Sequence, residues 1–477
     1  MSKTASILSV GIDIGTSTTQ VIFSRIDIDN TAGYFSAPRI AIIGKELLYK
    51  SSIYFTPLLS NDLIDAAAVR SIVSREYAQA GYAPEDVSTG AVIITGESAR
   101  KENAALVLQE LSGFAGEFVV STAGPDLEAV VAAKGSGAFE KSLRDECTVI
   151  NLDIGGGTTN IAVFDSGVEK GKTCYDIGGR LIRLDKNRRI SYISPAAEKI
   201  ARAQGIALQT GEQANEAVLM GIAEKMASLL AEAAGLLPSS PLLDSLRTVN
   251  SSRLVPPKGK AYICFSGGVG ECFRKDMAGD PFCYGDIGVL LGRAMRKHPA
   301  IQSARIAETA ETIRATVVGA GTYTTSLSGS TISYSPGVFP VKNLPVLRLS
   351  REEQARCVKG DAAFLAEKML WFLKQSDSDK MLVSLCGLRD PSYEDVQSLA
   401  ACFIRAADRS LLPETPLFTA VEEDMAKALG NGMKAMTDRR IAVIDSISAE
   451  AGDFVDIGRP MMDGLVVPVI VKTLLFG

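Results

Sequence analysis

Two short stretches place an aspartate at the end of a strand-like run, just before a turn rich in glycine and hydroxyl residues. The clearer one spans residues 149–164, VINLDIGGGTTNIAVF, in which Asp153 precedes three glycines and two threonines before β-branched residues resume. This order predicts a β-hairpin. The glycines leave backbone N–H groups accessible, so a phosphate can be held among amide dipoles. The aspartate can hold Mg²⁺ through water beside that phosphate.

A second copy of the pattern occupies residues 10–21, VGIDIGTSTTQV, with Asp13 in the place of Asp153. A single glycine turn can be an ordinary hairpin without a ligand, but two copies indicate two related lobes that present their loops to a shared cleft. The two aspartates are the predicted metal-binding and catalytic carboxylates. The predicted phosphate-binding residues are Gly15, Thr16, Ser17, Thr18, Gly155, Gly156, Gly157 and Thr158.

The paired hairpins resemble the actin, Hsp70 and hexokinase superfamily, whose two lobes clamp Mg-ATP between them. The resemblance implies that ATP and Mg²⁺ occupy the cleft. It also implies that an acidic residue, followed by a helix that crosses between the lobes, orients a water molecule. Residues 125–135 form the matching alanine-rich helix, and alignment on its Lys134-Gly135 end gives Asp126 this catalytic position, with Glu128 as a rival.

Composition excludes several classes of function. A formal net charge of -5 offers no basic excess for a nucleic-acid backbone. No apolar run approaches the ~20 residues that span a bilayer, and the first residues lack the pattern of a signal peptide, so we expect a cytoplasmic protein without a membrane partner. The single histidine, His298, argues against Ser-His-Asp catalysis. A length of 477 residues predicts roughly three domains.

The first domain, residues 1–147, is predicted to alternate strands and helices, with helices at 63–80 and 96–113 and strands at 91–95 and 117–121. The second, residues 148–330, begins with the clearer hairpin and continues with the Gly178-Gly179 pair. Its helices at 195–203 and 212–236 are predicted to form a cap over about 194–257. In the resembled fold such a cap covers the adenosine end of the nucleotide.

A third glycine motif lies at residues 261–273, AYICFSGGVGECF. It has the form of the superfamily's adenosine motif, in which glycines bring the backbone flat against the nucleoside. Gly267, Gly268 and Gly270 are therefore predicted to contact the nucleotide, as is the Gly178-Gly179 pair. The glycine-rich residues 284–295 are predicted to form the second interlobe helix. The rival stretch 317–330 is interpreted as an exposed strand pair.

Residues 331–477 are predicted to form an additional α/β unit that faces a partner. Prolines 336, 340 and 345 indicate a linker or edge region before it. Strands at 381–386, 417–421, 441–444 and 465–471 then alternate with helices at 351–374, 393–411 and 422–436. The predicted fold class is thus α/β: a two-lobed actin/Hsp70-like ATPase fold with an additional C-terminal α/β unit.

Across its full length the chain resembles the EutA family of ethanolamine ammonia-lyase reactivating factors, including TGESARKENA at 95–104 and ETIRATVVGAG at 311–321. The resemblance implies a chaperone that uses ATP to open ethanolamine ammonia-lyase, so that damaged cobalamin leaves and intact adenosylcobalamin enters. The cobalamin would sit in the partner. Association with a bacterial microcompartment and formation of a homodimer stay open.

Two other functions fit the same fold. A small-molecule kinase needs an aspartate base in a substrate pocket, and no motif identifies one. An actin-like scaffolding ATPase would form filaments that sediment in the presence of ATP.

Overall fold

The computed structural model describes residues 5–15, 18–30, 40–60, 63–95, 98, 102–111, 114, 120–122, 125–249, 251, 253–254, 261–275, 277, 279–323, 326–329, 331–376 and 378–473. The first sheet has the strand order β3-β2-β1-β7-β8, and β4 pairs with β2. Strands β1, β2 and β3 are antiparallel neighbours, whereas β7 and β8 run parallel to β1. These strands are β1 Ala5–Ile14, β2 Thr18–Asn30, β3 Ile40–Lys50, β4 Tyr54–Phe55, β7 Thr89–Ile94 and β8 Val120–Thr122.

The second sheet repeats this topology. Its order is β11-β10-β9-β14-β15, with β9, β10 and β11 antiparallel and with β14 and β15 parallel to β9. Its strands are β9 Thr148–Ile154, β10 Thr159–Asp165, β11 Val168–Tyr175, β14 Tyr262–Ser266 and β15 Arg305–Ile306. Both predicted hairpins therefore form, and the predicted two-lobed actin/Hsp70-like fold is confirmed.

Helices cover the outer faces of both lobes. In the first lobe, α1 starts later than the predicted residue 63 because Asp65 caps it and residues 63–64 pair with residues 58–60 as short antiparallel strands. In the second lobe, Ser194 and Asn215 cap the first two helices of the predicted cap. The elements are β5 Leu58–Ser60, β6 Leu63–Ile64, α1 Ala66–Ala80, α2 Ala104–Leu111, α4 Ala138–Arg144, β12 Ile182–Leu184, β13 Ile190–Ile193, α5 Pro195–Arg202, α6 Glu216–Ala233, α7 Pro241–Ser245, α8 Gly267–Arg274, α9 Gly288–Lys297 and α10 Pro299–Gln302.

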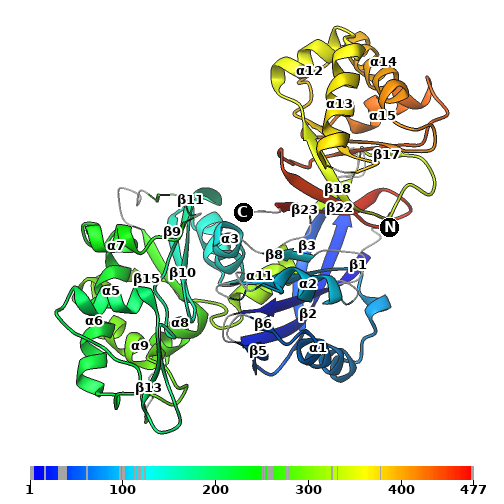
Figure 1. Ribbon diagram of the computed structural model, residues 1–477. Coiled ribbons are helices and arrows are strands. Elements are labelled where there is room, and N and C mark those ends of the chain that lie inside the picture. The colour runs from blue at the N-terminus through cyan, green and yellow to red at the C-terminus, as the bar shows by residue number, and fades with distance from the viewer. Residues whose placement is uncertain are drawn as a thin grey trace.

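Two crossing helices join the lobes, α3 Pro125–Gly135 and α11 Ala315–Tyr323. Figure 1 shows them between the blue first lobe and the green second lobe. They cross very closely: a Cβ added to Gly135 would lie 1.8 Å from the carbonyl oxygen of Ala315. One added to Gly319 would lie 2.0 Å from the carbonyl oxygen of Val131. Only glycine permits this approach at either position.

The second interlobe helix is thus α11, and the prediction that residues 284–295 form it is wrong. Those residues contribute to α9, which packs on α6 and α8 inside the second lobe. Gly292 permits that packing, because its Cβ would lie 2.7 Å from backbone of Cys272. The stretch 317–330 is likewise not a strand pair, since its first part is helical and only β16, Ser326–Gly329, is a strand.

The C-terminal unit is built on a third sheet of order β16-β23-β22-β18-β19-β20-β21-β17. Strands β18 to β21 are parallel, and the helices α12 to α15 connect them on one side of the sheet (Figure 1). The elements are β17 Ser333–Tyr334, β18 Val341–Arg348, α12 Arg351–Val358, α13 Ala362–Ser376, β19 Leu382–Leu385, α14 Tyr393–Ser410, β20 Leu417–Val421, α15 Ala426–Lys434, β21 Ile441–Asp445, β22 Asp453–Ile457 and β23 Val466–Thr473.

Two predictions for this unit need correction. Residues 341–348, expected in a linker or edge region, form an inner strand, in which Pro345 pairs opposite Phe454, just after a register shift between Val341 and Leu344. The single helix predicted at 351–374 is two helices, because Gly360 takes a left-handed conformation with φ of 85° between them.

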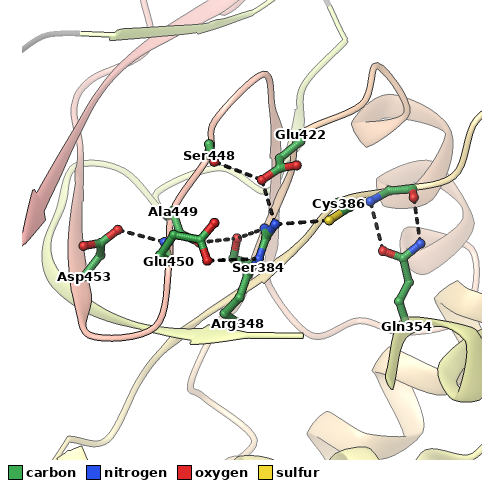
Figure 2. Close-up of polar contacts among 10 residues, drawn as sticks. Arg348, Gln354, Ser384, Cys386, Glu422, Ser448, Ala449, Glu450 and Asp453 are labelled. Atoms are coloured by element: carbon green, nitrogen blue, oxygen red, sulfur yellow. Dashed lines mark hydrogen bonds and ion pairs between the residues drawn. The ribbon is translucent and has the colours of Figure 1, made fainter. Parts of the chain in front are cut away.

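The carboxyl ends of β18, β19 and β20 meet at Arg348, as Figure 2 shows. Its guanidinium donates to Ser384 Oγ at 3.0 Å, to Cys386 Sγ at 3.1 Å and to Glu422 Oε1 at 2.7 Å. Glu450 approaches the same side chain at 3.7 Å. One partly buried cation therefore holds together the loops that follow these strands.

The C-terminal unit also packs on the first lobe. Ile470 of β23 is buried in a cluster with Ile93 of β7, Val131 of α3 and Ala320 of α11. Met461 and Met462 pack near Ile7 and Ile26. Because β16 pairs with β23, the third sheet begins before residue 331. The domain boundaries at 147/148 and 330/331 stay predictions.

No helix among the described residues is long and apolar enough to cross a membrane.

Candidate functional site

A cavity of about 430 Å³ lies between the first two lobes, beside the crossing of α3 and α11. Both predicted aspartates, Asp13 and Asp153, line it, so the structure brings the two hairpins together. The cavity wall also includes predicted phosphate- and nucleoside-binding residues from four separate segments. These are Gly15, Thr18, Gly155, Gly156, Gly157, Thr158, Gly179, Gly267 and Gly268.

Asp13 is the last but one residue of β1, and its side chain is buried. Thr95 donates a hydrogen bond to its Oδ1 at 3.0 Å. Burial raises the pKa of Asp13 to about 7, against the lowering effect of that hydrogen bond, and the charge of Asp153 raises it further. The pKa of this group therefore suits binding of a cation, which would favour the ionised form.

Asp153 occupies the matching position in β9. Ser266 donates to its Oδ1 at 2.6 Å, and Thr316 of α11 donates to its Oδ2 at 3.4 Å. Burial raises the pKa of Asp153 to about 6, although both hydroxyl donors lower it. Three elements, β9, β14 and α11, thus fix this carboxylate, and a residue of the interlobe helix touches it directly.

The two hairpins share one closing hydrogen bond. Gly15 N donates to Thr18 O at 2.8 Å, and Gly155 N donates to Thr158 O at 3.0 Å. Thr56 and Ser98 both donate to Gly15 O, at 2.7 and 3.0 Å, which holds the first turn in place. Thr16 and Ser17, predicted to bind phosphate, lie outside the described residues.

The other predicted glycines differ in whether they line the cavity. Gly179 and Gly268 line the cavity, and a Cβ added to Gly268 would meet no atom within 4 Å. Gly267 has φ of 81° and packs on the carbonyl of Ile154, so the backbone conformation at this position requires glycine whether or not a ligand binds. Gly178 packs on Gly156 and Gly270 on Phe265, and neither belongs to the described lining. A direct contact of these last two with nucleotide stays a prediction.

Of the two acids considered for the acidic position on α3, Glu128 has a described side chain, and the choice between it and Asp126 stays a prediction. Its buried side chain lines the cavity together with Asp13 and Asp153. Asp126 belongs to the first turn of the same helix, but its side chain lies outside the described residues. Of Asp126 and Glu128, Glu128 is therefore the acid whose side chain is known to line the cavity.

Sequence reasoning missed Gln20, which lies opposite Asp13 in the hairpin register. Its side chain is 1% exposed and lines the cavity. The amide nitrogen donates to Ile313 O at 3.3 Å, which fixes Oε1 as the acceptor, and Oε1 has no hydrogen-bond partner. Counting residues across the predicted hairpin would have placed this amide beside the aspartate.

The lining fits a polyphosphate that arrives with a divalent cation. Among the described lining residues, five carboxylates face one guanidinium, so a bare anion would be repelled. Magnesium binds through one or two carboxylates and keeps several waters. The unpartnered Oε1 of Gln20 is an acceptor that such a water would satisfy. The five acids are Asp13, Glu128, Asp153, Glu271 and Asp286, and the guanidinium is that of Arg180.

Comparison with known structures gives only distant similarity. Component A of (R)-2-hydroxyglutaryl-CoA dehydratase from Acidaminococcus fermentans is 13% identical over 66% of this chain and 96% of that chain, with a TM-score of 0.34. The ethanolamine utilization protein EutJ from Carboxydothermus hydrogenoformans is 16% identical over 66% and 89% of the two chains, with a TM-score of 0.31. The fold assignment rests on the sheet order.

Comparison with known sequences is far closer. The ethanolamine ammonia-lyase reactivase EutA of Salmonella typhimurium is 39% identical over 481 residues, which cover 99% of each chain. The protein of the same name from Escherichia coli is 38% identical over 480 residues, again 99% of each. The model of the family described as ethanolamine utilisation protein EutA matches residues 5–477. The chain therefore belongs to the EutA family.

Proposed function

We propose that this protein is an ATP-dependent reactivase of ethanolamine ammonia-lyase, which releases damaged cobalamin from that enzyme so that intact adenosylcobalamin can bind. The observation that carries the proposal is the 39% identity, over nearly the full length of both chains, to a protein named as a reactivase of this lyase. The cavity between two phosphate-type hairpins supports the ATP-dependent part, because it joins the carboxylates and glycine turns that Mg-ATP requires.

In this proposal the chain's own residues position the reactants. Asp13 and Asp153 would hold Mg²⁺ through its waters, and the ion would neutralise charge on the phosphates. The amides of the two glycine turns bind phosphate oxygens, and Glu128 orients the attacking water. Positioning and electrostatic stabilisation account for most catalysis of phosphoryl transfer, so no covalent intermediate with the protein is needed.

The free energy for changing the partner's conformation comes from the difference in how ATP and ADP bind the two lobes. Phosphates that contact both hairpins bridge the lobes and favour their closure, and losing the γ-phosphate weakens that bridge. Inverting a 1:99 population of two conformations needs about 5.5 kcal/mol of differential binding. The path to the C-terminal unit is short, because Ile470 packs directly on α3 and α11.

Nucleotide binding is tested by calorimetry with a substitution that fills the cavity and not the core. Gly268→Val places its Cβ where no protein atom lies within 4 Å, so we expect the protein to fold normally and to bind ATP at least tenfold more weakly. Unchanged affinity in this variant would contradict the assigned site.

Reactivation is tested with ethanolamine ammonia-lyase blocked by cyanocobalamin. Adding the protein, ATP, Mg²⁺ and adenosylcobalamin should restore deamination, and omitting ATP should prevent recovery. Phosphorylation of a small metabolite faster than plain ATP hydrolysis would instead support a kinase. Sedimentation of the protein with ATP would support a scaffolding role.

A further inference from the structure

Asp286 is a buried carboxylate for which the phosphate and metal chemistry above provides no role. It lies just before α9 and lines the cavity. Its Oδ1 accepts a hydrogen bond from Gly288 N at 2.9 Å, and its Oδ2 lies 4.0 Å from Nη1 of Arg180. Burial raises the pKa of Asp286 to about 6, and the contacts with Gly288 and Arg180 lower it only in part. A buried carboxylate on a cavity wall is stabilised when a ligand brings further donors to it.

Backbone hydrogen bonds fix where Asp286 lies relative to the glycine turn of the second hairpin. Gly179 N donates to Gly155 O at 2.9 Å, and Arg180 N donates to Gly156 O at 2.7 Å. On the other side of this segment, Ile287 N donates to Gly179 O at 3.1 Å. The order along the wall is therefore glycine turn, then residues 179–180, then residues 286–287.

That order matches the order of groups in a nucleotide. If phosphates lie over the glycine turn, the sugar follows at residues 179–180 and 286. The same cavity is also lined by Met277 and Tyr284, an apolar and an aromatic side chain that a base can contact. A ribose presents two adjacent hydroxyl donors, and a single carboxylate is the acceptor that dinucleotide-binding folds use for them. Arg180, whose Nη1 lies 4.0 Å from Oδ2 of Asp286, offsets part of the carboxylate's charge.

We propose that Asp286 accepts hydrogen bonds from the ribose hydroxyls of the bound nucleotide and so selects ribonucleotides over deoxyribonucleotides. This inference rests on the proposed function, because it requires nucleotide in the interlobe cavity. In this proposal Asp286 recognises the sugar, whereas the residues described above bind the phosphates and the metal.

The test compares affinities for Mg-ATP, 2′-deoxy-ATP and 3′-deoxy-ATP by calorimetry. Each deoxy nucleotide should bind the unaltered protein about tenfold more weakly than ATP, because a hydrogen bond to a buried charged group is lost. In Asp286→Asn, which keeps the shape but replaces an acceptor oxygen by a donor, the ratios should fall to about one. The affinity for inorganic triphosphate, which has no sugar, should change little.

Asp280→Asn is the matched control. Asp280 belongs to the same loop, but it lies near Arg188 at 3.3 Å and outside the cavity lining. This variant should keep the discrimination of the unaltered protein. A purely structural Asp286 would change the melting temperature of its variant and leave the ratios unchanged, which would overturn the proposal.

The unaltered protein gives an answer that needs no variant. Equal affinity for ATP and both deoxy nucleotides would overturn the role of Asp286 while leaving ATP binding intact. No binding of ATP or triphosphate at all would overturn the proposed function and this inference together.

Discussion

At the scale of single residues, burial disfavours the charged forms of the two cavity aspartates. Asp13 and Asp153 are both buried, and their pKa values of about 7 and about 6 lie above the 3.8 of an unperturbed aspartate. An acid whose pKa is raised by folding binds its proton more tightly in the folded state. The free energy of unfolding therefore falls as the pH rises from about 4 to about 7, and it stays reduced above that range.

Asp13→Asn should remove this penalty. At pH 8 we expect the variant without nucleotide to be more stable than the unaltered protein, by up to about 3 kcal/mol. Near pH 4 the gain should vanish, because both proteins then carry a neutral group. Urea unfolding at the two pH values measures this, and a variant destabilised equally at both would contradict the assigned pKa.

The same pKa values predict proton release on binding. A cation favours the ionised carboxylates, so Mg-ATP should expel about one proton from the protein near pH 6 and almost none near pH 8. Calorimetry in two buffers of different ionisation enthalpy counts these protons. ATP contributes its own protons, so the comparison is with Asp153→Asn, which should release fewer; identical counts would exclude Asp153 from the metal site.

At the scale of elements, the two hairpins could be predicted from their local sequence, whereas the second interlobe helix could not. Glycines and hydroxyl residues between β-branched runs predict turns wherever they occur. Small residues in a helix predict close packing but not its partner. Both α9 and α11 contain small residues. The sequence favoured α9 as the second interlobe helix, but Gly292 of α9 packs on α8 instead. Ala315 and Gly319, four residues apart and so on one face, mark the face of α11 that crosses α3.

Gly319→Ala tests the crossing. Its methyl group would lie 2.0 Å from Val131 O, so the helices must separate, and we expect a loss of about 3 kcal/mol or more in unfolding free energy. Gly221→Ala is the control, because Gly221 lies in α6 with no atom within 4 Å of the added Cβ. That variant should be neutral or more stable by up to about 1 kcal/mol. Equal effects in thermal unfolding would refute the close crossing.

At the scale of the whole molecule, the C-terminal unit packs against both helices that join the first two lobes. Its sheet could be predicted from alternating strands and helices, but its attachment could not, because Ile470 and Val131 lie more than three hundred residues apart and no local pattern links them. The contact places β23 on both interlobe helices. A change in their crossing therefore has a direct route to the C-terminal unit.

Ile470→Ala should cost about 2 to 4 kcal/mol, because the side chain is fully packed against Ile93 and Val131. Leu465→Ala, at a site that is 44% exposed in the same segment, should cost little. If the C-terminal unit follows the interlobe helices, Ile470→Ala should also reduce reactivation more than it reduces ATP hydrolysis. Proportional losses of both activities would place the coupling elsewhere.

The central claim is that Mg-ATP in the interlobe cavity drives work on ethanolamine ammonia-lyase. Recovery of deamination by cyanocobalamin-blocked lyase, measured with Asp153→Asn beside the unaltered protein, tests it most directly. The substitution keeps the shape of the side chain and removes the charge that would hold the metal, so recovery should fall at least a hundredfold while the melting temperature without nucleotide stays constant or rises. Full recovery with Asp153→Asn would contradict the account.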